Sequence, residues 1–280
     1  MTPVCTMQVF FIKKNNFSME FIDTHCHLYL EDFDKDRDEV IKESQKSGVS
    51  HILLPNIDWE SLMPMLDVCK AYPRVCYPMI GLHPCNVKAD YKDVLQKIFD
   101  CFSPHIFIAV GEVGIDLYWD TTFINEQKEA LRFQVQFALE HDLPLVIHKR
   151  QSYTQTMEVL NEFQGEKLKG IFHCYSGSLS HAEEVIEKGF LLGIGGTVTH
   201  KTSTLYTILP YIPLEYIVLE TDAPFLAPTP HRGERNKCSY LPIIAQRIAD
   251  IKQITTKEVV MQTTKNAKEM FFPKNKSTEE

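Results

Sequence analysis

The feature that most constrains the fold is a regular alternation of short apolar runs with amphipathic stretches, which begins at residue 21. The apolar runs have the length of buried strands. The amphipathic stretches carry apolar residues at the i, i+3, i+4, i+7 spacing of a helix with one buried face, as at Leu241, Ile244, Ala245 and Ile248. We expect eight strands, at residues 21–24, 51–54, 75–80, 106–110, 145–147, 170–172, 190–194 and 216–219.

Alternating strands and helices indicate parallel strands joined by helical crossovers. Eight such units in about 250 residues predict an α/β fold, a single-domain (β/α)8 TIM barrel. An open doubly wound sheet is the alternative, but no G-x-G-x-x-G follows the first apolar run. The chain of 280 residues contains no long linker, so we expect one barrel over 19–272 and a polar tail at 273–280. Residues 1–18 are expected to be either an N-terminal extension or a misassigned start.

Composition limits the partners of the chain. Its formal net charge of −8 argues against broad electrostatic adhesion to nucleic acid, although a small positive site remains compatible with it. No apolar stretch reaches the 18 residues of a membrane span, so we expect no membrane association. The eight cysteines form no C-x-x-C pair, and a chain of this size needs no disulfides, which favours reduced thiols and a cytoplasmic location. Nothing in the sequence indicates an obligate protein partner.

Histidines and acids gather where the predicted strands end. Catalytic groups of a TIM barrel stand at this end of the strands. Four histidines and two carboxylates lie just past five different predicted strands: His25, His27, Glu112, His148, His173 and Asp222. The six side chains are therefore expected to meet at one end of the barrel.

The H-x-H pair is the most specific part of this pattern. Residues i and i+2 of a strand point to the same face, so His25 and His27 can approach one ion. Alone, such a pair is more often two surface or hydrogen-bonded histidines. Here His148 and His173 each follow an apolar run directly, where a buried imidazole needs a partner. The four histidines together therefore favour a metal site.

The two acids extend the prediction to two ions. A carboxylate at the position of Glu112 or Asp222 is costly to bury unless it is paired or bound to metal. Six ligands are too many for one catalytic ion, which keeps an open position, but they suffice for two ions about 3.5–4 Å apart. Glu112 lies midway round the barrel and is the expected bridge. Cys26 lies between the two histidines and is expected to point away from them into the core.

At these residues the sequence resembles the TatD family of metal-dependent deoxyribonucleases, within the amidohydrolase-like superfamily. The resemblance covers about residues 20–272 and rests on seven motifs: DTHCHL (23–28), GLHP (81–84), GEVGID (111–116), PLVIH (144–148), HCYSG (173–177), ETDAPFLAP (220–228) and RGERN (232–236). Lys237 and Cys238 depart from the acid and proline that usually follow the last motif, which leaves the shape of this loop open.

The resemblance implies a TIM barrel that hydrolyses phosphodiester bonds of DNA, often as a 3′–5′ exonuclease on single strands. It implies two divalent metal ions, with Mg²⁺ or Mn²⁺ expected in function and Zn²⁺ readily bound by affinity. By position it assigns His25, His27, Glu112 and Asp222 to one ion, and Glu112, His148 and His173 to the other. The expected mechanism is activation of a water bridging the ions, with Asp222 both ligating and accepting the proton of that water.

Four further residues are candidates for substrate binding. His83 either contacts the scissile phosphate or structures its loop, and Arg150 either clamps phosphate as a fork or pairs with a nearby acid. Arg232 and Arg235 either line the groove or pin their loop.

The loop after the fourth predicted strand carries three more candidates. Asp116 is expected to orient a ligand histidine or hold the turn. Tyr118 and Trp119 either stack on a base or pack as a lid.

Two other functions stay open. Another hydrolase of the same superfamily would act on an amide, lactone or phosphotriester, but many of those barrels bridge their metals with a modified lysine where this chain has Glu112. A catalytically idle barrel that only binds metal would have lost ligands, and all six are present.

Overall fold

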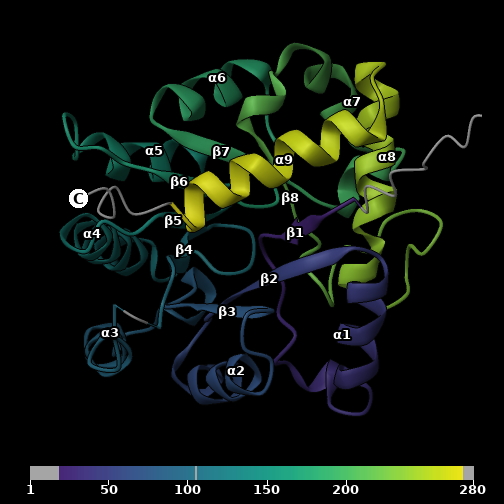
Figure 1. The fold of residues 1–280 in the computed structure, drawn as a ribbon. Helices are drawn as coiled ribbons and strands as arrows, with labels where there is room; N and C mark the ends of the chain where they lie inside the picture. Colours follow the sequence, from purple (N-terminus) through teal and green to yellow (C-terminus); the bar gives the residue numbers. More distant parts are fainter. Residues whose placement is uncertain (1–18, 105, 274–280) are drawn as a thin grey trace, which may run out of the picture.

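The computed structural model describes residues 19–104 and 106–273, and the predicted extension at 1–18 lies outside this part. Eight parallel strands follow one another in chain order (Figure 1). Their bounds are β1 Phe21–Asp23, β2 Val49–Pro55, β3 Cys76–Met79, β4 Val110–Asp116, β5 Leu145–Arg150, β6 Gly170–Phe172, β7 Phe190–Ile194 and β8 Ile217–Leu219.

The strands form a closed barrel. Parallel pairing joins the strands into two groups, one in the order β1-β2-β3 and the other in the order β4-β5-β6-β7-β8. A bridge between Ile80 and Val110 links the two groups on one side, and a bridge between Cys26 and Ala223 links them on the other. The predicted single-domain (β/α)8 TIM barrel is confirmed.

Helices surround the barrel, as expected for crossovers between parallel strands (Figure 1). Gly48 and Gly189, each with φ of 93°, follow α1 and α6 and turn the chain towards the next strand. The helices are α1 Arg37–Lys46, α2 Trp59–Ala71, α3 Tyr91–Phe99, α4 Ile124–Glu140, α5 Tyr153–Asn161, α6 Leu179–Glu187, α7 Leu205–Ile208, α8 Leu241–Lys252 and α9 Thr256–Phe271. Among the helices described, none is long and apolar enough to cross a membrane.

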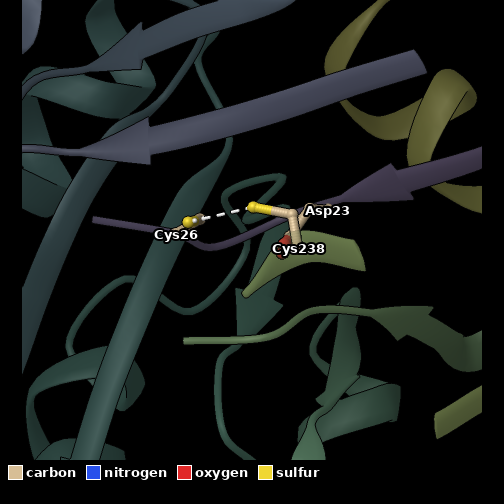
Figure 2. A group of neighbouring side chains, drawn as sticks. All are labelled: Asp23, Cys26 and Cys238. Atoms are coloured by element: carbon tan, nitrogen blue, oxygen red, sulfur yellow. Dashed lines mark hydrogen bonds between the residues drawn. The ribbon is translucent and has the colours of Figure 1, made fainter. Parts of the chain in front are cut away.

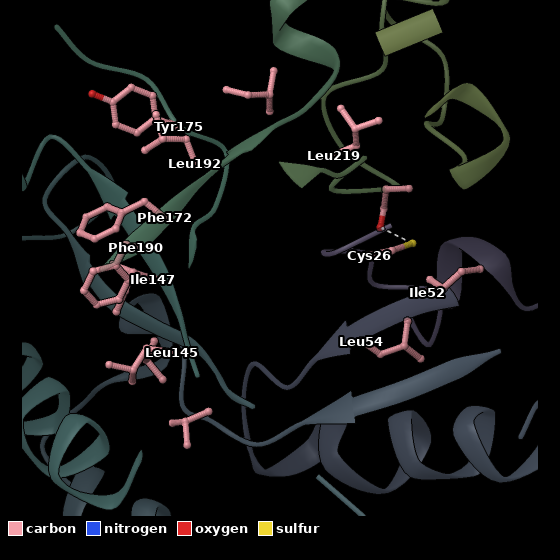
Figure 3. Close-up of a cluster of buried hydrophobic side chains, with 14 of the residues drawn as sticks. Cys26, Ile52, Leu54, Leu145, Ile147, Phe172, Tyr175, Phe190, Leu192 and Leu219 are labelled. Atoms are coloured by element: carbon pink, nitrogen blue, oxygen red, sulfur yellow. Dashed lines mark hydrogen bonds between the residues drawn. The ribbon is translucent and has the colours of Figure 1, made fainter. Parts of the chain in front are cut away.

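Side chains alternate between two apolar layers along each strand, as the period of a strand requires. Leu145 and Ile147 of β5 pack in the larger layer, which also contains the buried face of α8 (Figure 3). Val146, between them, packs in a second cluster with one residue from most other strands. Ala267 and Phe271 of α9 belong to this second cluster, and Figure 1 shows α9 running across the strands. The helix α9 therefore covers the interior of the barrel.

The fourth strand differs from the prediction. It was expected at 106–110 but occupies Val110–Asp116, so Glu112 lies within β4 and not in the loop after it. The segment contains two glycines and two acids, a composition that is unusual for a buried strand. It is nevertheless a strand, because β4 pairs with β5 through Asp116 and Arg150, and its polar side chains serve the site.

Candidate metal centre

The six predicted ligands converge at the carboxyl ends of the strands. His25 and His27 follow β1, and their Nε2 atoms lie 3.2 Å apart, which confirms that the H-x-H pair shares a face. Glu112 comes from β4 and His148 from β5. The remaining two, His173 and Asp222, follow β6 and β8. Five separate strands thus contribute to one cluster.

Glu112 separates the cluster into two sets of donor atoms. Its Oε2 lies 3.1 Å from Nε2 of His25 and 3.6 Å from Nε2 of His27. Oδ1 of Asp222 closes this first set, 3.7 Å from His25 and 3.4 Å from His27. The opposite oxygen, Oε1, lies 2.8 Å from both Nδ1 of His148 and Nε2 of His173. Each carboxylate oxygen therefore faces a different group of imidazoles.

These separations fit shared metal ligands. Two nitrogen or oxygen ligands that each lie about 2.1 Å from one ion are about 3.0–3.4 Å apart at octahedral or tetrahedral angles. The contacts within the first set span 3.1–3.7 Å, and Nδ1 of His148 lies 3.3 Å from Nε2 of His173 in the second. His25 Nδ1 and His173 Nδ1 are buried without a hydrogen-bond partner. Imidazole and carboxylate donors of this kind suit Zn²⁺ and Mn²⁺.

Outer partners fix the proton positions of two of the histidines. The hydroxyl of Tyr29 donates to the carbonyl of Pro55 at 2.6 Å and lies 2.9 Å from Nδ1 of His27. Nδ1 therefore donates to that hydroxyl, which leaves the lone pair of Nε2 directed into the site. Tyr29 was missed in the sequence, although it lies two residues past His27 and continues the alternation of the pair.

Asp116 does the same for His148. Its Oδ2 lies 2.9 Å from Nε2 of His148, so Nε2 donates and the lone pair of Nδ1 faces Glu112. Burial raises the pKa of Asp116, but the hydrogen bonds from His148 and from the backbone of Trp119 and Tyr118 outweigh it and set the pKa at about 2. A charged carboxylate behind a ligand histidine is a common means of orienting the ring.

Glu220 is a second residue that the sequence interpretation did not assign. Its side chain is fully buried, and Oε1 accepts from the backbone N–H of Cys174 at 2.5 Å and lies 3.6 Å from Nδ1 of His173. The absence of a side chain at Gly193 makes room for the carboxylate of Glu220, since a Cβ there would lie 2.8 Å from the carboxyl carbon. Glu220 stands two residues before Asp222, and this spacing was the available signal.

Both carboxylates in the cluster are ionised. Burial raises the pKa of Glu112, but the histidines around it, His173 first, hold that pKa well below its usual value. Burial likewise raises the pKa of Asp222, and the polar contact with His27 and the charges of nearby histidines bring it below its usual value. The centre therefore presents negative charge between imidazoles, an environment that attracts divalent cations.

His83 also reaches this centre. Its Nε2 lies 3.3 Å from Oε1 of Glu112 and 3.3 Å from Nδ1 of His148. The backbone N–H of Cys85 donates to Nδ1 of His83 at 3.1 Å. The neutral ring accordingly carries its proton on Nε2, which faces the site as a donor.

Arg150 and Arg235 lie in different surroundings. Arg150, at the end of β5, lines a cavity of about 390 Å³ together with His148, His173 and Asp222. Arg235 is not brought there: its guanidinium forks onto Asp36 at 2.9 and 2.6 Å. This geometry matches the alternative in which Arg235 pins its loop.

The last candidate, Arg232, is exposed on the loop between β8 and α8. It does not line the cavity that Arg150 borders. The structure therefore does not bring Arg232 to the candidate metal centre.

Three buried side chains, Asp23, Cys26 and Cys238, lie together where the end of β1 meets the loop before α8 (Figure 2). The thiols of Cys26 and Cys238 are 3.3 Å apart, and both residues are fully buried. The expectation that Cys26 points into the core is confirmed. Asp23 accepts hydrogen bonds from the backbone and hydroxyl of Thr221 at 2.9 and 2.6 Å, and burial raises its pKa to about 7. The group thus joins the end of β1 to the segment that follows β8.

Comparison with known proteins gives the family. A family model described as TatD related DNase matches residues 22–272. A metal-dependent hydrolase of Bacillus subtilis, itself uncharacterized, is 35% identical over 250 residues, 89% of this chain and 98% of the relative. A protein of Pectobacterium carotovorum named 3′-5′ ssDNA/RNA exonuclease TatD is 28% identical and covers 89% of this chain and 98% of its own length. The crystal structure of a TatD homologue from Escherichia coli K12 superposes with a TM-score of 0.84 at 26% identity, covering 90% of this chain and 98% of the other. The chain belongs to the TatD related DNase family and is a metal-dependent hydrolase.

Proposed function

We propose that the chain is a nuclease that hydrolyses phosphodiester bonds of DNA, as a 3′–5′ exonuclease on single strands, with two divalent ions in its active site. The observation that carries the proposal is the division of Glu112, whose Oε2 faces His25 and His27 while Oε1 faces His148 and His173. A carboxylate that bridges two ions about 3.5–4 Å apart is typical of enzymes that cleave phosphate esters. The Pectobacterium relative is named for an exonuclease activity on single-stranded DNA and RNA.

The same geometry supports the proposed ligand sets. The first ion would be held by His25, His27, Glu112 and Asp222, and the second by Glu112, His148 and His173. Divalent ions in such a site lower the pKa of bound water towards about 7 and neutralise charge on phosphate oxygens. Mg²⁺ or Mn²⁺ is the proposed ion in function, and Zn²⁺ would also bind these ligands.

The protein's own residues carry out the other parts of the reaction. Asp222 is ionised and borders the cavity, so it can accept the proton of the attacking water. His83 presents an N–H at the centre and would donate to a phosphate oxygen. Arg150 lines the same cavity and would neutralise a further phosphate.

Cellular location is also part of the proposal. The seven cysteines in the part of the chain that the structure describes are all free thiols. Free thiols are typical of a reducing compartment, which favours the cytoplasm.

Digestion of single-stranded and double-stranded oligonucleotides labelled at the 3′ or the 5′ end tests the proposal. We expect metal-dependent loss of nucleotides from the 3′ end of single strands, and a loss of activity of several orders of magnitude in Glu112→Ala. Parallel assays with lactones, amides and a phosphotriester cover the other hydrolases of the superfamily. Turnover of one of these, without cleavage of any nucleic acid, would overturn the nuclease proposal.

A further inference from the structure

Three planar side chains form a cluster beside the candidate metal centre. The guanidinium carbon of Arg150 lies 3.8 Å from the ring centre of Tyr118 and 5.2 Å from that of Trp119. The two rings are 4.9 Å apart in an edge-to-face arrangement. The strands β4 and β5 bring them together, because Arg150 pairs in register with Asp116, two residues before Tyr118. We call these three residues the Arg150 cluster.

The Arg150 cluster is open to solvent. Tyr118 is 48% exposed and Trp119 is 68% exposed. The guanidinium of Arg150 has no hydrogen-bond partner among residues 19–104 and 106–273. The guanidinium of Arg235, by contrast, donates two hydrogen bonds to Asp36. The cluster thus offers a bare aromatic face together with unused guanidinium donors, a combination suited to a partner with both a planar ring and an anion.

A single carboxylate ties the cluster to the metal ligands. Oδ1 of Asp116 accepts from the backbone N–H groups of Tyr118 at 2.9 Å and of Trp119 at 3.1 Å. Oδ2 of the same side chain contacts Nε2 of His148 at 2.9 Å. The turn that carries the two aromatic residues and the ring that faces Glu112 are therefore held by the same group, and Arg150 borders the cavity onto which His148 opens.

We propose that the Arg150 cluster is a subsite for an unpaired nucleobase of the substrate. The base stacks on the exposed face of Trp119, and Arg150 pairs with a phosphate next to that base. This inference rests on the proposed nuclease function and adds the recognition element that the metal ligands lack. A base inside a duplex already has neighbours on both faces, whereas an unpaired base is free to stack on a side chain. The subsite therefore selects single strands, and it tolerates every sequence because each base has a π face.

Trp119→Ala tests the subsite, with Tyr211→Ala as the matched control. Tyr211 is 71% exposed and lies in the segment that enters β8, at the opposite end of the strands from the metal ligands. Stacking of one base contributes enough to change affinity by at least about fivefold. We expect KM for a single-stranded oligothymidylate to rise by at least about fivefold in Trp119→Ala, with kcat little changed. KM is expected to stay at the wild-type value in Tyr211→Ala.

Abasic substrates separate stacking from a structural role. Single abasic residues are placed in turn at each of the last three 3′ positions of the oligonucleotide. At one of these positions the wild-type enzyme should show a KM increase like that caused by Trp119→Ala. The variant should be insensitive to the same change, because the stacking partner is already gone. A variant that is damaged structurally would instead remain as sensitive to the missing base as the wild type.

Fluorescence gives an independent readout because the chain has two tryptophans. In Trp59→Phe the remaining tryptophan emission comes from Trp119. We expect saturating oligothymidylate to quench it more strongly than the abasic oligomer that shows raised KM.

The failures can be told apart. If the wild type cleaves no nucleic acid, the nuclease proposal fails and the subsite fails with it. If the wild type cleaves DNA but Trp119→Ala has the same KM and the same response to abasic residues, only the subsite is overturned. Equal quenching by the two oligomers would overturn it as well.

Discussion

Asp116→Asn tests whether the charge behind His148 sets the affinity of the second ion. Oδ2 of Asp116 accepts from Nε2 of His148 at 2.9 Å, which keeps Nδ1 free to ligate. An amide group in this place presents a donor to Nε2 and favours the tautomer with its proton on Nδ1, the atom that faces Glu112. Changes in such outer partners typically cost 10–100-fold in metal affinity, or about 1.4–2.7 kcal/mol. The amide oxygen can still accept from the backbone of Tyr118 and Trp119, so the fold is expected to persist.

The assay is calorimetric titration of metal-free protein with Mn²⁺. We expect the variant to bind one equivalent as the wild type does and the other, at the site of His148, about 10–100-fold more weakly. Asp120→Asn is the matched control, since Asp120 lies in the same loop, accepts from the backbone of Thr122 at 2.8 Å and is 44% exposed. An unchanged second affinity in Asp116→Asn, or an equal loss in the control, would refute the reasoning.

Three further predictions concern packing, the loop after β8 and the ions. Gly193→Ala should destabilise the fold by about 1–3 kcal/mol in thermal denaturation, because the added Cβ would lie 2.8 Å from the carboxyl carbon of buried Glu220. The control Gly195→Ala should be near neutral, because a Cβ there would lie at least 3.5 Å from its nearest neighbouring atom. Equal effects of the two substitutions would contradict this packing. Arg235→Ala should leave KM for DNA unchanged and cost at most about 1 kcal/mol of stability, since its pair with Asp36 is partly exposed; a raised KM would return Arg235 to the substrate groove. Removal of metal with a chelator should lower Tm by about 10–20 °C, given about 2.7 kcal/mol of stabilisation from each of two ions at 100 times its Kd. An identical Tm would show that the ions do not bind the native state.

The sequence predicts the barrel because burial on both faces of a parallel strand leaves a visible apolar run. This signal fails at β4, where polar residues needed at the site occupy the strand itself and Glu112 was placed in a loop. β5 shows the same effect on a smaller scale, since it continues through His148 to Arg150, past the predicted end at residue 147.

The clustering of the six candidate metal ligands could be predicted because each histidine or acid lies just past one of five predicted strands, whose carboxyl ends meet at one end of a barrel. The residues behind them were less predictable. Tyr29 and Glu220 contact His27 and His173 through single atoms, and their spacing from the ligands was the signal available. The partner of Arg235 could not be predicted, because Asp36 lies 199 residues away and only the closed barrel brings the two together.

The most direct test of the proposed two-ion hydrolysis is the rate of single-strand cleavage as metal-free protein receives zero, one and two equivalents of Mn²⁺. Glu112 faces the two ligand sets through opposite oxygens, so we expect hydrolysis to require both ions. Release of nucleotides from a 3′-labelled strand is expected to stay near background at one equivalent and to rise steeply with the second. Full activity at one equivalent, or no cleavage at two, would contradict the central claim.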